Sequence, residues 1–244
     1  MKTLQDKHFL IIGATGNLGA ATARRLKDEG AGLTLTGRNS EKLNALGEEL
    51  SAPSLALDLL QTKDRAALAE GIDKVDGVVD AAGVAPLSPL KYIKDVDMEY
   101  CLLMNLQRPT AILRDLVKAG KLNTGGSIVW ISSMAASLAT PGYAIYAASK
   151  AGLEAAGRCL ALELAPKSIR LNCIAPGMIE SDMAGEVAEK ISNEAMDRHF
   201  QKYPLGLGQA RDVADVAVFL LSERARWITG TVLTLDGGYT LTKY

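Results

Sequence analysis

The sequence predicts an α/β fold in which a doubly wound parallel sheet of about seven strands carries helices on both faces. Short apolar runs alternate with longer amphipathic segments along the whole chain, which is typical of repeated strand–helix–strand units. The runs are almost continuously apolar, as expected for parallel strands covered on both sides. A glycine-rich turn joins the first run to the first helical segment, and such turns are common in doubly wound sheets.

Seven runs are predicted to be strands, because each is short, apolar and bounded by turn-forming residues. They span residues 8–12, 32–36, 54–57, 75–79, 127–131, 169–174 and 231–235. The main helices are expected at residues 18–27, 43–50, 96–119, 143–164 and 213–221. No linker or repeat interrupts this pattern, so we expect one domain over residues 1–244. The long stretch without a strand, residues 177–210, is expected to include a lid over the substrate.

The chain of 244 residues has 48% hydrophobic and 23% charged residues and a formal net charge of −1. A chain of this length buries about 70–75% of its unfolded surface, which is enough for one large core. Its near-neutral charge does not favour nucleic acid or an anionic membrane, and we expect neither as a partner. The apolar run near the N-terminus is too short for a signal peptide or a membrane span, which favours a cytoplasmic location.

Cysteine and histidine offer little material for a reactive or metal-binding site. Cys101, Cys159 and Cys173 are far apart and odd in number, so we expect them to be reduced core residues. His8 and His199 are the two histidines, too few for a typical zinc site and poorly placed for a Ser-His-Asp triad. We therefore expect no metal.

The turn after the first strand has the glycine spacing of a dinucleotide-binding loop. Glycines let the backbone turn tightly and approach a pyrophosphate, whose charge is then stabilised by free amides at the helix N-terminus. The sequence thus predicts a Rossmann fold with a nicotinamide cofactor. The expected binding residues of this loop are Gly13, Thr15, Gly16, Asn17, Leu18 and Gly19.

The end of the second strand indicates which nicotinamide cofactor is preferred. An acidic residue there would bind the ribose hydroxyls of NAD, whereas an arginine suits the 2′-phosphate of NADP. The sequence has no carboxylate at this point, and Arg38 follows Gly37, which leaves space beside it. We predict NADP(H), with Arg38 on the 2′-phosphate, and regard NAD(H) as the possible alternative.

Tyr146 and Lys150 lie four residues apart in a predicted helix, and therefore on one face of it. A free tyrosine has a pKa of about 10 and is a poor acid or base at neutral pH. An ammonium about 4 Å away would stabilise the phenolate by roughly 4 kcal/mol, so we expect Lys150 to lower the pKa of Tyr146. Ser132 or Ser133, at the end of the preceding strand, could then hold the oxygen of a carbonyl or alcohol substrate.

With these motifs in this order, the chain resembles the short-chain dehydrogenase/reductase family from residue 9 to residue 238, and is similar to its 3-oxoacyl-(acyl-carrier-protein) reductase-like members. The family serine lies thirteen residues before the tyrosine, which selects Ser133 over Ser132. The resemblance implies that Ser133 binds the carbonyl, Tyr146 transfers the proton, and Lys150 binds the nicotinamide ribose and the tyrosine. It also implies that Asn105 supports a water-linked proton relay.

The resemblance adds further cofactor contacts. An aspartate near the adenine, a turn beside the adenosine ribose and a Pro-Gly segment over the nicotinamide correspond to Asp58 with Leu59, to Ala81, Ala82 and Gly83, and to Pro176, Gly177, Ile179 and Ser181. A C-terminal signature matches residues 228–230 and 236–238. The family also implies a homotetramer or homodimer, for which a small-residue face of Ala147, Ala151 and Ala155 would permit close helix packing.

Several residues depart from the family pattern. Asn17 gives the glycine loop the spacing of the extended, nucleotide-sugar branch, and the loop lacks a basic residue before its middle glycine. Asp80 replaces the usual turn asparagine, and as a carboxylate it would repel a nearby phosphate. Ser181 replaces a threonine and keeps its hydroxyl.

We therefore expect an NADP(H)-dependent enzyme that interconverts a ketone and a secondary alcohol. The resemblance implies a 3-oxoacyl thioester or a small ketone or alcohol as the substrate. The segments expected to line the pocket, 84–90, 134–143 and 178–203, are largely apolar, which favours a non-ionic substrate. Two alternatives stay open on these residues. One is an extended-type nucleotide-sugar epimerase or dehydratase, and the other is a non-catalytic protein that senses NADP(H).

Overall fold

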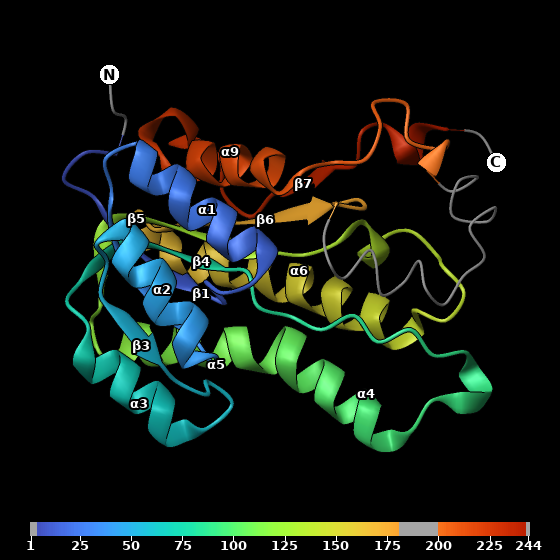
Figure 1. The fold of residues 1–244 in the computed structure, drawn as a ribbon, viewed down its shortest axis with the longest axis horizontal. Coiled ribbons are helices and arrows are strands. Elements are labelled where there is room, and N and C mark those ends of the chain that lie inside the picture. Colours follow the sequence, from blue (N-terminus) through green and yellow to red (C-terminus); the bar gives the residue numbers. More distant parts are fainter. Residues whose placement is uncertain (1–3, 181–199, 243–244) are drawn as a thin grey trace.

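Seven parallel strands form one sheet in the order β3-β2-β1-β4-β5-β6-β7 in the computed structural model, which describes residues 4–180 and 200–242 (Figure 1). The strands are β1 (His8–Ile12), β2 (Gly32–Gly37), β3 (Ser54–Ala56), β4 (Val75–Asp80), β5 (Leu122–Ile131), β6 (Arg170–Pro176) and β7 (Val232–Leu235). The order reverses between β1 and β4, and open sheets bind ligands beyond the carboxyl ends of the strands at such a point. The predicted fold class is confirmed.

Helices pack on both faces of the sheet because each buried strand carries apolar side chains on both of its sides. In β1, Phe9 and Ile11 belong to one core cluster, whereas Leu10 and Ile12 belong to the other. The first cluster is covered by α1 (Asn17–Asp28), α2 (Ser40–Leu50) and α9 (Ala210–Leu221). The second is covered by α3 (Thr62–Gly71), α5 (Arg108–Lys118) and α6 (Ala144–Leu164).

The helix expected over residues 96–119 is present, but it is not a regular α-helix throughout. The structure has α4 (Asp95–Leu102), a π-helical turn at Leu103–Gln107 and then α5. Pro109 supplies the physical reason, because it has no N–H to donate to the carbonyl four residues earlier, that of Asn105. A wider turn relieves the clash of the proline ring with the preceding turn, and such π turns often occur at functional sites.

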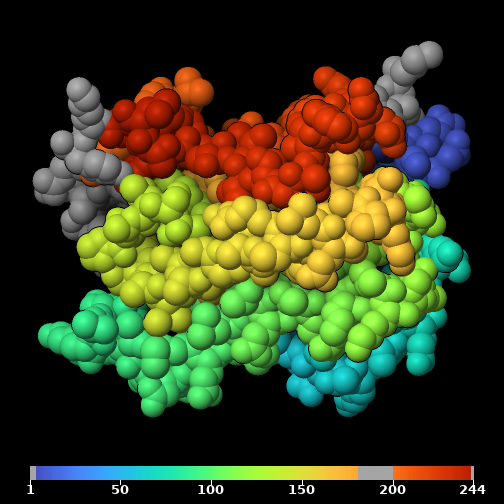
Figure 2. Space-filling view, turned by 180° about the vertical axis from the view of Figure 1, so that it is seen from behind, coloured from blue at the N-terminus to red at the C-terminus, as the bar shows by residue number. Residues whose placement is uncertain are grey.

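Two smaller expectations also change. β5 begins at Leu122 rather than at residue 127, and its extra residues pair irregularly with β4, where the register shifts between Val75 and Gly77. Cys101 and Cys173 are buried as expected, but Cys159 is exposed, so its predicted place in the core is wrong. It lies on α6, whose outer side forms part of the surface shown in yellow in Figure 2.

Short 3-10 helices complete the described chain, at Leu90–Tyr92, Met134–Ala136, Ala165–Lys167, Glu223–Ala225 and Tyr239–Leu241. The middle of the expected lid, residues 181–199, lies outside the described residues. Within the described ranges, no helix has both the length and the apolar character that crossing a bilayer requires.

Candidate active site at the carboxyl ends of the strands

The glycine loop between β1 and α1 has the geometry of an anion site. Gly13 has φ +75°, and a Cβ atom there would lie 2.7 Å from the backbone nitrogen of Ala82 on the neighbouring strand's turn. A Cβ at Gly19 would collide with the carbonyl oxygen of Gly13. Gly16 is the N-cap of α1 and provides no side-chain cap, and the first turn of α1 has no acidic residue. The first amides of α1 are therefore available to a pyrophosphate.

Asn17 connects the glycine loop to the segment that follows β6. Its side-chain Nδ2 donates to the carbonyl oxygen of Glu180 over 3.0 Å. The same segment is fixed from the other side, where the amide of Glu180 donates to the carbonyl of Gly208 and Gly177 donates to Leu235. Pro176, Gly177 and Ile179 therefore belong to a segment that is bound to the glycine loop through Glu180, whereas Ser181 lies outside the described residues.

The loop after β2 is open to solvent. Arg38 and Asn39 are both exposed, and Asn39 caps α2 by accepting from the amide of Lys42. A Cβ at Gly37 would lie 3.3 Å from the Oγ1 of Thr15, so the glycine loop approaches the end of β2 closely. The Arg38 side chain is therefore near the expected position of the adenosine ribose, in a region that water can screen.

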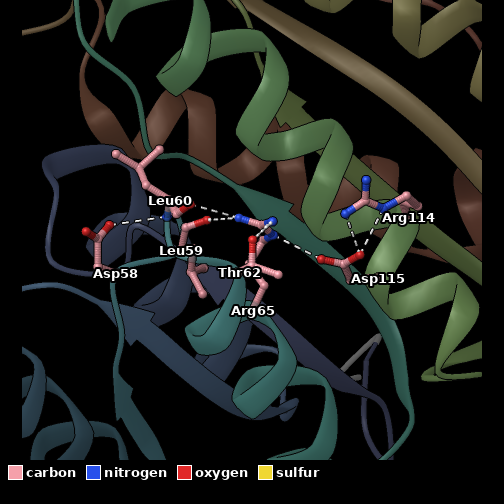
Figure 3. Close-up of polar contacts among 7 residues, drawn as sticks. All are labelled: Asp58, Leu59, Leu60, Thr62, Arg65, Arg114 and Asp115. Atoms are coloured by element: carbon pink, nitrogen blue, oxygen red, sulfur yellow. Dashed lines mark hydrogen bonds and ion pairs between the residues drawn. The ribbon is translucent and has the colours of Figure 1, made fainter.

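The turn after β3, which carries Asp58 and Leu59, is held by Arg65 from α3 (Figure 3). The backbone of Asp58 donates to the carboxylate of Asp64, and its own Oδ1 accepts from the amide of Leu60. The Arg65 guanidinium donates to the carbonyls of Leu59 (3.2 Å) and Leu60 (3.0 Å), the hydroxyl of Thr62 (3.1 Å) and the carboxylate of Asp115 on α5 (3.0 Å). Hydrogen bonds from Arg65 therefore connect the expected adenine turn to helices α3 and α5.

Lys150 and Asn105 meet beside the turn after β4. The Nζ of Lys150 is buried and donates to the carbonyl of Ile131 at the end of β5, over 2.8 Å. The side chain of Asn105 binds both backbone groups of Val84, accepting from its N–H (2.9 Å) and donating to its carbonyl (2.8 Å). A Cβ at Gly83 would lie 3.0 Å from the Oδ1 of Asn105 and 3.3 Å from the Nζ of Lys150. Gly83 is therefore the residue around which these two side chains converge.

The two serines after β5 face different partners. The hydroxyl of Ser132 donates a hydrogen bond to the carboxylate of Glu154 on α6, with 2.6 Å between the two oxygens. Ser133, whose backbone is extended, lies close enough to Tyr146 for its hydroxyl to act on the pKa of the phenol. Ser133, and not Ser132, is therefore the serine that lies beside Tyr146.

The expected lowering of the Tyr146 pKa by Lys150 is wrong for this structure. Burial raises the pKa of Tyr146, and the hydroxyl of Ser133 only partly opposes this effect. Lys150 directs its ammonium to the carbonyl of Ile131, and burial lowers the pKa of Lys150 itself to about 8. The sequence argument assumed a charged lysine close to the phenol and neglected the cost of burying both groups.

The carboxylate of Asp80, at the end of β4, is paired with an arginine. It forms a buried ion pair with Arg108 on α5, with 2.8 Å between Nη2 and Oδ1. Its Oδ1 also accepts from the amide of Ala82. The expected repulsion of a phosphate by Asp80 is therefore wrong, because a guanidinium neutralises the carboxylate inside the fold.

Sequence reasoning missed two residues that shape the site, Arg65 and Arg108, and included Tyr203 only as the end of the segment 178–203 expected to line the pocket. Tyr203 is buried, and its hydroxyl accepts from the amide of Met178 over 3.0 Å and lies 4.0 Å from the sulfur of Met134. A signal for Arg108 did exist, because it follows Asn105 by about one helical turn and adjoins Pro109.

Comparison with known proteins agrees with this geometry. The protein family described as enoyl-(acyl carrier protein) reductase matches residues 13–240. The 3-oxoacyl-(acyl-carrier-protein) reductase FabG of Rickettsia bellii is 34% identical over 241 residues, covering 98% of each chain. FabG of Thermotoga maritima is 33% identical over 248 residues, covering 98% of this chain and 99% of its own.

Solved structures show the same fold. A short-chain dehydrogenase/reductase from Mycobacterium ulcerans superposes with a TM-score of 0.91 at 28% identity, covering 99% of this chain and 92% of its own. A 7α-hydroxysteroid dehydrogenase, complexed with NADH and 7-oxo glycochenodeoxycholic acid, gives 0.89 at 29% identity, covering 97% and 95%. The sheet order and the glycine loop define the class of Rossmann-fold oxidoreductases. Within that class, the chain belongs to the short-chain dehydrogenase/reductase family.

Proposed function

We propose that this protein interconverts a ketone and a secondary alcohol with NADP(H). The observation that carries the proposal is the convergence of Ser133, Tyr146, Lys150 and Asn105 at the carboxyl ends of β4 and β5. The four side chains come from three parts of the chain, the π-helical turn, the segment after β5 and helix α6, and lie at the edge of the sheet where open α/β proteins bind ligands. A shared location of this kind is what acid–base catalysis on one substrate oxygen requires.

The residues around the glycine loop fit a dinucleotide. Free amides at the start of α1 suit the pyrophosphate, and the exposed Arg38 beside Gly37 suits a 2′-phosphate. The cofactor would be held by Gly13, Thr15, Gly16, Asn17, Leu18, Gly19, Arg38, Asp58, Leu59, Ala81, Ala82, Gly83, Tyr146, Lys150, Pro176, Gly177, Ile179 and Ser181. When bound, it supplies or accepts the hydride at the substrate carbon.

The chain's own groups handle the substrate oxygen. The hydroxyl of Ser133 donates a hydrogen bond to that oxygen and orients it next to Tyr146. The phenol of Tyr146 gives the proton during reduction and takes it back during oxidation. Its raised pKa favours the protonated phenol, which is the form that ketone reduction uses. Lys150 holds the nicotinamide ribose, and Asn105 fixes the backbone of Val84 at the inner end of the site.

We infer that the substrate is a 3-oxoacyl thioester or another apolar ketone. The relatives named as 3-oxoacyl-(acyl-carrier-protein) reductases support the thioester, and they match the chain along almost its whole length. Met134, Met178 and Tyr203 lie together beside Ser133 and would give an apolar wall to an acyl chain.

We also propose that the enzyme assembles as a homotetramer or homodimer. α4, α5 and α6 form a broad continuous surface in Figure 2, in green and yellow. Large apolar side chains are exposed on these helices, among them Val96 of α4 and Leu162 of α6, and Ala155 of α6 is also exposed. Such a surface favours packing against a second copy.

Oxidation of NADPH and NADH, followed at 340 nm with a ketone panel, tests the proposed function. Acetoacetyl-CoA serves as the soluble 3-oxoacyl thioester, with small ketones and nucleotide sugars alongside it. We expect turnover of at least one ketone, at a higher kcat/KM with NADPH than with NADH. Tight NADPH binding without turnover of any ketone would instead support a sensor, and turnover of a nucleotide sugar alone would support an epimerase or dehydratase.

A further inference from the structure

The ion pair between Asp80 and Arg108 lies directly behind the site, although neither residue faces the substrate. Both side chains are about 96% buried, with exposed fractions of 3% and 4%. An ion pair this deep costs a large desolvation free energy, so it is seldom a simple source of stability. Its place beside Lys150 and Asn105 calls for a functional explanation.

The Arg108 guanidinium joins two parts of the backbone that carry the site. Besides Asp80, it donates to the carbonyl of Ala82 over 3.0 Å and to that of Met104 over 3.1 Å. Ala82 belongs to the turn after β4, and Met104 immediately precedes Asn105 in the π-helical turn. The pair therefore fixes the distance between the cofactor turn and the Asn105 segment.

Arg108 is also the only residue that forms an ion pair with Asp80 among the described residues. The second carboxylate oxygen, Oδ2, is buried and has no hydrogen-bond partner within the described ranges. Asp80 lies at the edge of a cavity of about 10 Å³ whose other walls are apolar, among them Ile12, Pro109 and Trp130. The charges of Asp80 and Arg108 thus act on their surroundings in a medium of low dielectric constant, with little screening.

Lys150 lies within the field of both charges. Burial lowers its pKa to about 8, the Asp80 carboxylate raises it, and the Arg108 guanidinium lowers it. The other titratable groups that act on Lys150 are the thiols of Cys101 on α4 and Cys173 on β6. Burial raises the pKa of both thiols, that of Cys173 to about 12, so both are largely uncharged near pH 8.

The remaining groups near Lys150 lie on its own helix or after β5. Burial raises the pKa of Tyr146, one turn earlier, and Glu154, one turn later, accepts a hydrogen bond from Ser132. Neither acts on the pKa of Lys150, whereas the ion pair does. Asp80 and Arg108 are therefore the charges that reach the lysine across the interior near pH 8.

We propose that Asp80 and Arg108 are positioning residues of the active site: their ion pair aligns the Gly83 turn with Asn105 and balances the electrostatic field at Lys150. Asp80 occurs where the family resemblance places an asparagine. The ion pair is therefore a feature of this chain and not one of the catalytic residues that the family shares. This inference depends on the proposed function in one respect only, the catalytic role of Lys150. The field itself can be measured without cofactor or substrate.

The test is an NMR titration of protein labelled with ¹³C at the lysine ε-carbon, between pH 6 and pH 11. The Lys150 resonance is identified by its loss in Lys150→Arg. Asp80→Asn removes the negative charge and should shift the Lys150 titration to lower pH by about 1 pH unit. Arg108→Gln removes the positive charge and should shift it to higher pH. General loosening of the fold would move both titrations in the same direction.

Two further variants separate charge from position. Arg108→Lys keeps the charge but cannot reproduce the planar fork, so the Lys150 titration should remain near that of the wild type while NADPH binds about tenfold more weakly. Arg170→Gln is the matched control, because Arg170 is a buried arginine bound to the carbonyls of Leu220 and Ser222, away from the site. It should lower Tm and leave the Lys150 titration unchanged.

Shifts of opposite sign in Asp80→Asn and Arg108→Gln support the proposal. Shifts of the same sign, an unchanged titration in both, or an equal shift in Arg170→Gln overturn it. Should Arg108→Gln fail to fold, Asp80→Asn decides alone, because asparagine is nearly isosteric and the sign of its shift is fixed. Absence of ketone turnover in the wild-type protein, with the expected NMR shifts in the variants, would leave this inference standing and count against the proposed function instead.

Discussion

The two ends of the proposed cofactor site differ in how the chain holds its charges. At the nicotinamide end, Lys150, Asp80 and Arg108 are buried, and each is bound to backbone groups, while Asp80 and Arg108 also bind each other. At the adenosine end, Arg38 is exposed, and the turn with Asp58 is held from behind by Arg65 (Figure 3). Catalysis is thus expected at the buried nicotinamide end, and selection between NADP and NAD at the solvent-exposed adenosine end.

This contrast teaches which substitutions will matter most. Two charges 4 Å apart interact by about 4 kcal/mol at an effective dielectric constant of 20, but by about 1 kcal/mol in bulk water. Exposed ion pairs contribute roughly 0–1 kcal/mol, and salt weakens them further. Changes at the buried end should therefore alter rates by orders of magnitude, while those at the exposed end should alter affinity by smaller factors.

The largest effect is expected at Tyr146. Tyr146→Phe removes the proton donor and keeps the ring, so kcat should fall by about 10²–10⁴-fold while NADPH affinity is retained. Stopped-flow reduction of the best ketone and NADPH fluorescence titration measure the two quantities. Tyr143→Phe is the matched control, since its ring lies 5.6 Å from that of Tyr146, and it should change kcat by less than about tenfold. Near-normal turnover in Tyr146→Phe would contradict the assignment.

An intermediate effect is expected at Arg38. Arg38→Ala removes a charge-assisted contact worth about 1.5–3 kcal/mol, so NADPH should bind about 10–100-fold more weakly while NADH binding stays unchanged. Calorimetric Kd values for both cofactors at two ionic strengths provide the measurement. Arg24→Ala, which removes another exposed arginine from an ion pair with Glu49, serves as control and should affect neither cofactor. Equal losses for NADPH and NADH would show that Arg38 does not contact the 2′-phosphate.

The smallest effect is expected at Arg65, which touches the adenine turn only from behind. Arg65→Met should weaken NADPH and NADH alike, by about three- to tenfold, because both share the adenine and the turn loses a buried donor. Arg114→Met is the matched control, since Arg114 binds the same carboxylate, Asp115, from the exposed side. It should leave both Kd values unchanged. A loss confined to NADPH would place Arg65 at the phosphate and not at the turn.

Much of the fold could be read from the sequence because its signals are local. The runs that become β1, β2, β4 and β6 are short and mostly apolar, and the glycines at positions 13 and 19 are required by steric contacts that few other residues tolerate. The break in the helix over 96–119 was missed, although Pro109 signals it, because the apolar pattern continues across the π-helical turn.

The electrostatics of the site could not be predicted in the same way. The spacing of Tyr146 and Lys150 indicates a shared helix face, but it does not reveal how deeply either group is buried, and burial decides the direction of both pKa shifts. The pairing of Asp80 with Arg108 joins residues 28 positions apart on different elements. Asn17 looked like a departure toward another branch, and the structure shows it bound to the carbonyl of Glu180.

The π-helical turn before α5 has a consequence for tolerance to insertions and deletions. Each residue advances an α-helix by about 100°, so one extra residue in a turn re-aims every side chain that follows it. Here the wide turn lets Asn105 reach the backbone of Val84 while Arg108, soon after, reaches Asp80. Losing a single residue between Cys101 and Arg108 would rotate one of these side chains out of contact even if the sheet stayed intact.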